Sequence, residues 1–216
     1  MRRGVRLPLE QLAPYLLPVP KAPARLDWRV VFGNAHPVEI EIGFGKGSFL
    51  LTGAMARRNV NFLGVEIERK YQLFTANRIG KRGLSNVRLV CADARNFLRD
   101  CVTSESVHAI HVYFPDPWWK RRHHKRRLWT PEFAGQCERI LKSGGRLHVA
   151  TDVGDYFAII AAVLVERPRM RASYLSEPNV PAHDLDFITN FERKSLQAGK
   201  PVYRSVHEKL PARREE

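Results

Sequence analysis

With 216 residues, 44% of them hydrophobic, the chain fits one globular domain that needs no disulfide or metal to stabilise its core. Its three cysteines, Cys91, Cys101 and Cys137, are too far apart for a CxxC metal or redox pair. The longest apolar run, residues 156–165, has ten residues where a membrane span needs about 20, and no secretion signal is visible, so we expect a cytoplasmic protein. The net charge of +14 favours a polyanionic partner such as a nucleic acid.

Residues 1–37 are expected to form a basic, proline-rich N-terminal arm outside the core, because five of the 14 prolines come before residue 24. A short helix around residues 9–17 is compatible with the sequence there, although Pro14 opposes a regular one. From residue 38 to residue 216, strands and helices alternate in a single domain. The predicted strands cover residues 38–42, 61–67, 87–91, 107–114, 146–151, 170–175 and 202–209. The predicted helices cover residues 49–58, 68–81, 94–101, 131–141 and 155–166, the first capped by Ser48.

This alternation predicts an α/β domain with a mostly parallel, seven-stranded sheet and helices on both faces. Ligands bind to such sheets at the carboxyl ends of the strands. The residues that directly follow each predicted strand are therefore the candidates for function.

A glycine-rich turn follows the first strand. Gly43, Gly45 and Gly47 have the spacing GxGxG, and Ser48 stands where a dinucleotide GxGxxG motif needs glycine. Glycines let the backbone approach a ligand, but alone this pattern is equally compatible with a simple tight turn. Glu41, just before the turn, would repel a pyrophosphate and attract an ammonium group.

Two further acids end the next strands. Glu66 ends the second strand, 25 residues after Glu41, where a carboxylate can accept hydrogen bonds from both ribose hydroxyls. Asp93 follows the third strand, where it can meet an adenine edge or simply cap the next helix. This arrangement resembles the class I (Rossmann-like) S-adenosylmethionine methyltransferases. The resemblance implies that S-adenosylmethionine is bound by Glu41, Gly43, Gly45, Glu66 and Asp93.

The fourth strand leads directly into Pro115-Asp116-Pro117-Trp118. The two prolines restrict the backbone around Asp116 and hold its carboxylate at the ligand edge of the sheet. Trp118 and Trp119 offer faces on which a base can stack. The simpler alternative is a proline-stabilised turn whose aromatic side chains belong to the core.

Six of the 36 basic residues lie in the run 120–127, which continues this loop. A solvated surface or a localisation signal has a similar composition. Because the run adjoins the candidate active site, we interpret it as a phosphate-binding segment. His123 and His124 are adjacent and no acid follows at ligand spacing, so we expect no metal site.

The sequence at this loop resembles the signature of one family, the bacterial tRNA (guanine-N7)-methyltransferases, or TrmB family. The matching segment is Pro115-Asp116-Pro117-Trp118-x-Lys120-x-Arg122-His123-x-Lys125-Arg126-Arg127. Three further blocks are similar to that family's, in the same order: Glu41-Ile42-Gly43-Phe44-Gly45, Thr151-Asp152 and Thr189-Asn190-Phe191-Glu192. The similarity extends from about residue 38 to residue 208.

This second resemblance implies methyl transfer from S-adenosylmethionine to N7 of guanine-46 in the variable loop of tRNA. It implies that Asp116 borders the cofactor and is the catalytic acidic group. The implied substrate contacts are Lys120, Asp152, Thr189, Asn190, Phe191 and Glu192. The candidate RNA-backbone contacts are Arg122, Lys125, Arg126 and Arg127. From the residues alone, Asp152 is equally compatible with a helix cap, and Thr189-x-x-Glu192 with a capping box.

Three other functions stay open at this point. Related enzymes methylate amino nitrogens of bases with Asn/Asp-Pro-Pro-aromatic loops. An RNA-binding protein with a vestigial cofactor pocket would share the charge, but Glu41, Glu66 and Asp93 oppose it. A nicotinamide-dependent dehydrogenase is disfavoured by Ser48 and Glu41. The sequence does not indicate the oligomeric state, monomer or homodimer, or which tRNAs are chosen.

Overall fold

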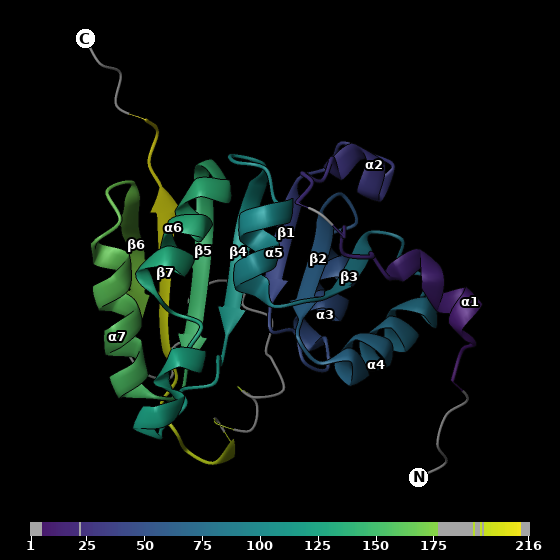
Figure 1. Cartoon of the computed structure of the whole chain (residues 1–216). Helices are drawn as coiled ribbons and strands as arrows, with labels where there is room; N and C mark the ends of the chain where they lie inside the picture. The colour runs from purple at the N-terminus through teal and green to yellow at the C-terminus, as the bar shows by residue number, and fades with distance from the viewer. Residues whose placement is uncertain (1–5, 22, 177–191, 193–194, 196, 213–216) are drawn as a thin grey trace.

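The computed structural model describes residues 6–21, 23–176, 192, 195 and 197–212. Its seven-stranded sheet has the order β3-β2-β1-β4-β5-β7-β6 (Figure 1). β7 is antiparallel to both neighbours and the other pairs are parallel, which confirms the predicted mostly parallel sheet. The strands are β1 (Val38–Ile42), β2 (Asn61–Glu66), β3 (Val87–Cys91), β4 (Val107–Tyr113), β5 (Leu141–Thr151), β6 (Met170–Ser176) and β7 (Tyr203–Lys209).

The helices of the described residues follow the predicted alternation. They are α1 (Leu9–Leu12), α2 (Trp28–Phe32), α3 (Ser48–Ala56), α4 (Arg69–Gly80), α5 (Ala94–Cys101), α6 (Pro131–Ile140) and α7 (Gly154–Val165), with short 3-10 turns η1 (Ala13–Tyr15) and η2 (Arg121–Arg126). None of the helices among these residues has both the length and the apolar character needed to cross a membrane.

Two local predictions differ from the structure. Ser48 is the first residue of α3, and Gly47 occupies the cap position with φ +65° and no side-chain cap hydrogen bond. β5 begins at Leu141, which pairs with Val107, whereas the next pair joins Arg146 to Ala109. The predicted fifth strand, residues 146–151, is therefore the later part of a longer strand that contains an irregularity near its start.

Each face of the sheet carries its own hydrophobic cluster. Helices α5, α6 and α7 bury side chains such as Phe97, Phe133 and Tyr156 against one face. Helices α3 and α4 bury Phe49 and Ile79 against the other. Figure 1 shows α5, α6 and α7 in front of the sheet and α3 behind it. This three-layer packing leaves the ends of the strands accessible.

The N-terminal segment contributes to the core, unlike the expectation that it lies outside. Leu12 is 4% exposed within the α3–α4 cluster, and Phe32 is 7% exposed within the opposite one. Leu17 donates a backbone hydrogen bond of 2.9 Å to the Leu89 carbonyl oxygen, so the segment runs along the edge strand β3. Arg25 donates through Nη1 to the carbonyl oxygens of Arg99, at 2.6 Å, and Val102, at 3.0 Å.

The strand order reverses between β1 and β4. β1 pairs with β2 on one side and with β4 on the other, so the connections leave the sheet in opposite directions at this point. Open α/β sheets bind ligands in the crevice that such a reversal creates at the carboxyl ends of the strands. The glycine loop after β1 and the Pro-Asp-Pro loop after β4 both lie at this position.

Candidate active site at the strand ends

The glycine loop between β1 and α3 is held from both sides. Gly45 donates its N–H to Oε2 of Glu66 at 2.9 Å, which ties the loop to the end of β2. A Cβ on Gly47 would lie 2.2 Å from Cγ2 of Thr75 in α4, so only glycine fits there. The third glycine of the motif therefore serves packing. The backbone at Gly43 and Gly45 has open space beside it, because a Cβ at either position would meet no atom within 4 Å.

Glu41 is a buried acid with an unsatisfied oxygen. It is 4% exposed near the end of β1, and among the described residues its Oε2 has no hydrogen-bond partner. Burial, with the negative charge of Glu66 as a second cause, raises the pKa of Glu41 to about 8, against the opposing effect of the Leu50 amide. Such a group is suited to receive a cation, because a cation would both satisfy the oxygen and stabilise its charge.

Glu66 also has a local structural role. Its Oε1 accepts a hydrogen bond of 3.1 Å from the Glu68 N–H, while Oε2 accepts the one from Gly45. The side chain is 8% exposed. A carboxylate offers about four lone-pair positions, so two remain for ligand hydroxyls. The hydrogen bonds from the Gly45 and Glu68 backbone fix the orientation of the Glu66 carboxylate toward such hydroxyls.

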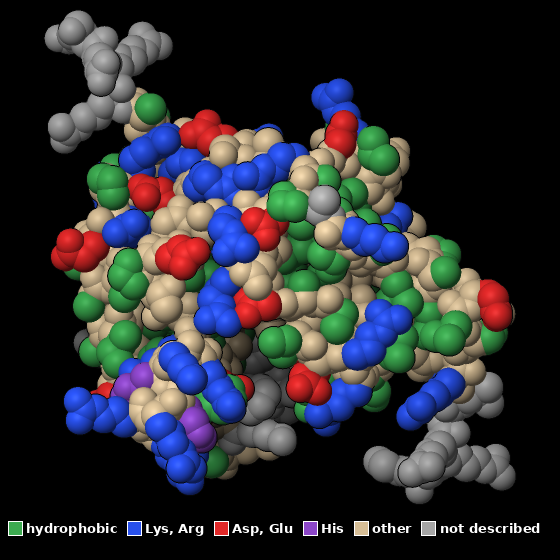
Figure 2. Space-filling view, in the orientation of Figure 1, with side chains coloured by type: hydrophobic (Ala, Val, Ile, Leu, Met, Phe, Trp, Pro, Cys, Tyr) green, Lys and Arg blue, Asp and Glu red, His purple; other side chains and the backbone are tan. Residues whose placement is uncertain are grey.

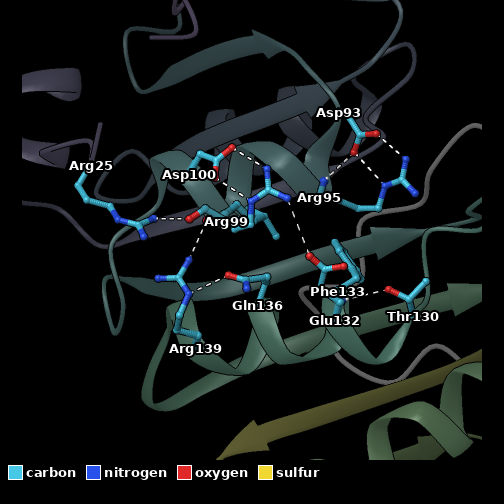
Figure 3. A network of polar contacts seen from close by, with 11 residues as sticks. Arg25, Asp93, Arg95, Arg99, Asp100, Thr130, Glu132, Phe133, Gln136 and Arg139 are labelled. Atoms are coloured by element: carbon cyan, nitrogen blue, oxygen red, sulfur yellow. Dashed lines mark hydrogen bonds and ion pairs between the residues drawn. The ribbon is translucent and has the colours of Figure 1, made fainter. Parts of the chain in front are cut away.

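Asp93 is the N-cap of α5, as one of the two sequence interpretations proposed. It accepts from the Arg95 N–H at 2.9 Å and forms a two-bond ion pair with the Arg95 guanidinium, at 3.1 and 2.6 Å (Figure 3). These bonds, led by the side-chain bond to Arg95, hold the pKa of Asp93 below its ordinary value. Asp93 stays ionised at the end of β3, and an adenine contact stays a prediction.

The loop that carries Asp116 has an unusual backbone. Phe114 and Trp118, on either side of the Pro-Asp-Pro segment, have φ angles of +52° and +45°. Non-glycine residues rarely adopt such angles unless the surroundings impose them. Arg127 contributes to this constraint, since its Nε donates to the Pro117 carbonyl oxygen at 2.8 Å. The loop presents Asp116 as an exposed side chain.

The basic run after this loop divides into two groups. Arg126 lies 5.0 Å over the Trp118 ring, and Arg127 is half-buried against the Tyr156 ring at 5.4 Å, so both help to hold the loop. Trp118 is thereby covered on one side, whereas Trp119 is 68% exposed. The remaining cations point to solvent: Lys120, Arg121, Arg122 and Lys125. These four are the better candidates for phosphate contacts.

The C-terminal candidates lie beside β5 and β7 where they are described. Asp152 accepts a hydrogen bond of 3.2 Å from Ser195, and the N-cap of α7 is Val153, so Asp152 is not that helix's cap. Glu192 is 3% exposed and forms an ion pair with Arg204 of β7. Thr189, Asn190 and Phe191 lie outside the described residues.

One buried polar network was not predicted from the sequence. Glu39 of β1 accepts from Arg57 at 2.6 and 2.9 Å and lies 3.0 Å from Nε2 of His111. Nδ1 of His111 is 2.9 Å from the Tyr113 hydroxyl, at the end of β4. Burial alone would raise the pKa of Glu39, but His111 and Arg57 lower it to about 2. The network therefore joins the end of α3 to the two strands that carry both loops. The one sequence feature that indicated this network is the alternation Glu39-x-Glu41, which places both acids on the same face of β1.

Replacing Glu39 with glutamine is expected to lower the free energy of unfolding at pH 7 by about 2 kcal/mol, because the half-buried Arg57 loses its charged partner. The pKa of Glu39 in the folded protein, about 2, lies below the ordinary 4.5. The stabilisation is therefore complete above pH 4.5 and is lost as the pH falls toward 2. Urea unfolding across this range measures both effects.

The matched control is Glu68→Gln. Glu68 pairs with Lys70, and the side chains of Lys70 and Glu68 are 68% and 55% exposed, so this variant should change stability little. Equal stability of the Glu39→Gln variant and the control would contradict this role.

The comparisons with known proteins agree with this geometry. A family model described as a putative methyltransferase matches residues 35–205. A tRNA (guanine-N(7)-)-methyltransferase of Rhodopirellula baltica is 41% identical over 195 residues, 87% of this chain and 71% of that protein. The enzyme of the same name from Burkholderia vietnamiensis is 37% identical over 97% of this chain and 81% of its own length. The chain belongs to the tRNA (guanine-N7)-methyltransferase family.

Solved structures support the fold of this family member. A 30S ribosomal A1408 methyltransferase from an uncultured bacterium has a TM-score of 0.59 at 15% identity, covering 84% of this chain and 91% of its own. TrmN from Thermus thermophilus has a TM-score of 0.60 at 18% identity, covering 84% of this chain and 47% of its own. At such low identities these structures show the class I methyltransferase fold alone. Within the described residues, no three His, Cys, Asp or Glu side chains converge as a metal site would require.

Proposed function

We propose that this chain transfers a methyl group from S-adenosylmethionine to N7 of guanine-46 in the variable loop of tRNA, in the cytoplasm. The relatives at 41% and 37% identity support the tRNA substrate and the guanine N7 target. The observation that carries the proposal is the meeting of two loops at the strand reversal. One follows the end of β1 that carries the buried, unsatisfied Glu41, and the other presents Asp116 beside exposed cations.

The residues around the glycine loop fit S-adenosylmethionine, which when bound supplies a methyl group activated by a sulfonium centre. In this proposal the carboxyl of Glu41 receives the ammonium of the methionine part. The open backbone at Gly43 and Gly45 lets the cofactor approach. Glu66 uses its two remaining acceptor positions for the ribose hydroxyls, and Asp93 meets the adenine edge. Asp116 borders the reacting end.

Methylation at N7 of guanine requires no proton transfer by the protein. N7 of guanine carries a lone pair and no proton, so its attack on a methyl group needs no general base. The chain must instead align the two reactants, which can contribute ~7–11 kcal/mol at best. Asp116 would hold the base through its N–H groups and stabilise the positive charge that spreads over the purine.

The RNA side of the proposal uses the residues around this loop. Lys120, Arg122, Lys125, Arg126 and Arg127 are proposed to contact the RNA, with Arg126 and Arg127 also holding the loop that they flank. Asp152, Thr189, Asn190, Phe191 and Glu192 are proposed to contact the substrate. Guanine-46 must leave its stacked position to reach Asp116, which costs a few kcal/mol for an extruded base.

Incubation of the protein with methyl-labelled S-adenosylmethionine and total tRNA, followed by nucleoside analysis, tests the proposal. The expected product is labelled 7-methylguanosine, lost when guanine-46 of a transcript is replaced by adenine. Label on an exocyclic amino group would indicate the alternative base methyltransferase. Binding of tRNA without any label transfer would indicate an RNA-binding protein instead.

Cofactor affinity is expected to depend on pH through Glu41. In the free protein its pKa of about 8 keeps the carboxyl mostly protonated near pH 7, whereas a bound ammonium requires the ionised form. Binding then releases a proton, so affinity should rise about tenfold from pH 6 to pH 7. Isothermal titration calorimetry at the two pH values measures this. Glu41→Gln should bind more weakly and without this rise, and a flat response in the parent protein would remove Glu41 from cofactor binding.

A further inference from the structure

An open groove lies between the N-terminal segment and helix α4. It has a volume of about 630 Å³ and is lined by residues 6–9, Leu12, Lys46 of the glycine loop and the exposed side of α4. A hydrogen bond joins its two sides, because the Leu7 N–H donates to Oδ1 of Asn77 in α4 at 2.8 Å. Neither Glu41 nor Glu66 lines the groove, although Lys46 directly follows Gly45 in the chain.

The polar lining of the groove is cationic. Arg6, Lys46 and Lys70 line it, all three are exposed, and none of its described lining residues is acidic. Lys70 has one acidic neighbour, Glu68, at 3.3 Å, in a solvent-exposed pair that is worth little. The first turn of α4 carries Arg69 and Lys70 and no acid. Cations there oppose the helix dipole, so helix stability does not explain them.

The apolar lining includes an exposed aromatic ring. Phe74 is 47% exposed on α4, and Tyr71 is half-buried one turn before it. The Arg78 guanidinium lies 5.9 Å over the Phe74 ring, and its Nη1 donates to the Lys46 carbonyl oxygen. An aromatic face surrounded by cations is the arrangement on which single-stranded nucleotides stack while their phosphates are neutralised.

The groove and the basic run after β4 both lie toward the carboxyl ends of the parallel strands, on opposite sides of β1. α4 follows β2 and η2 follows β4, and β1 lies between these two strands. Figure 2 shows Lys and Arg side chains at the lower left, with histidines, and again at the lower right beside α4. A polyanion bound at η2 and extending across the β1 loop would therefore reach Lys46 and Lys70.

We propose that this groove binds a nucleotide of the substrate RNA away from the methylated guanine. Lys46 and Lys70 neutralise its phosphates, and its base stacks on Phe74. This inference rests on the proposed function in one respect, that the substrate is RNA. It extends the RNA contact surface from the β4 side of the sheet to the β2 side and to the N-terminal segment.

Two variants test the groove by fluorescence anisotropy with labelled tRNA. Lys46→Ala/Lys70→Ala should weaken tRNA binding about tenfold and reduce the slope of log affinity against log salt by about 1.4–1.8, for two lost phosphate contacts. Lys142→Ala/Arg171→Ala removes the same charge from exposed positions at the opposite, amino end of the sheet and should leave tRNA binding within twofold of the parent. S-adenosylmethionine affinity, measured in parallel, should stay within twofold in both variants.

Phe74 tests stacking independently of charge. Phe74→Leu keeps an apolar side chain and should weaken tRNA binding about tenfold, whereas Phe74→Tyr keeps the ring and should bind like the parent. The groove proposal is overturned if the lysine variant and Phe74→Leu bind tRNA as tightly as the Lys142→Ala/Arg171→Ala control. A change of oligomeric mass in these variants with unchanged tRNA binding would likewise overturn it, in favour of a second copy of the chain. Absence of 7-methylguanosine with the parent protein would instead contradict the proposed function, while weaker RNA binding by the variants would still support the groove.

Discussion

Replacing Asp116 with asparagine is expected to lower the single-turnover methylation rate about a thousandfold and to leave tRNA affinity within twofold. Asparagine keeps the shape of the side chain but removes the negative charge that stabilises the cationic purine, and the loss of such a stabilising group costs roughly 10²–10³ or slightly more. The affinity should persist because the exposed cations of η2 contribute it. Asp155→Asn, an exposed aspartate at the start of α7, is the matched control.

The pH profile separates charge stabilisation from general-base catalysis. With no proton on N7 to remove, the parent's chemical step should show no rising limb caused by a base that deprotonates near neutrality. Single-turnover rates at saturating cofactor between about pH 6 and 9 measure this. A rising limb in the parent that is absent from Asp116→Asn would indicate methylation of an amino nitrogen instead. Full activity of Asp116→Asn would remove this residue from the mechanism.

Removing three exposed cations near the active site should weaken tRNA binding more than a hundredfold at low salt. Arg121→Ala/Arg122→Ala/Lys125→Ala takes away up to three phosphate contacts, each worth about 0.7–0.9 in the slope of log affinity against log salt. The variant leaves Arg126 and Arg127 unchanged, because they pack on Trp118 and bond Pro117. A loss of tRNA binding can then not be attributed to a displaced loop.

Filter binding or anisotropy over a range of salt concentrations measures this effect. Lys142→Ala/Arg146→Ala/Arg171→Ala removes an equal charge from exposed positions away from the site and is the control. Equal affinity and equal salt slope in the two variants would mean that net charge, and not the position of η2, attracts the RNA.

Much of the fold could be predicted because its signals are local. Residues 38–42 and 87–91 were predicted as strands with their observed bounds, and residues 94–101 as the observed helix. Alternating β-branched residues and a capping aspartate determine these elements within a few positions. The ligand end of the strands was predictable too, because it requires only that the strands are parallel, whereas the strand order was not predicted.

The differences arise where distant residues decide the local structure. Ser48 could not be rejected as a cap without knowing that Gly47 packs against Thr75, which is 28 positions away. The partners of Glu39 lie 18 and 72 positions along the chain, at Arg57 and His111. Neither Arg57 nor His111 stands out in the sequence, and it is the parallel pairing of β1 with β4 that brings His111 beside Glu39.

The sequence predicted which residues belong to the site better than it predicted which atoms of those residues contact one another. Glu41 and Glu66 were expected at the glycine loop, but the hydrogen bond from Gly45 to Glu66 depends on the loop's positive φ angles. Arg127 was predicted only as an RNA contact, and the bond from its Nε to the Pro117 carbonyl oxygen was not predicted. A charged run does not itself reveal which of its members turn inward, since that depends on the neighbouring carbonyl groups.

The contact between the N-terminal segment and β3 has a consequence for handling the protein. β3 is one border of the sheet, and an uncovered border strand offers unpaired N–H and C=O groups to other chains. Leu16 forms a parallel bridge to Leu89, and the Leu17 N–H occupies the Leu89 carbonyl oxygen, so the segment blocks strand addition there. A shortened protein that begins near residue 35, where the family match starts, would expose this border together with the apolar side chains that Leu12 covers. Self-association and loss from solution would then mimic a loss of activity, so shortened forms should be judged by their aggregation state before their kinetics.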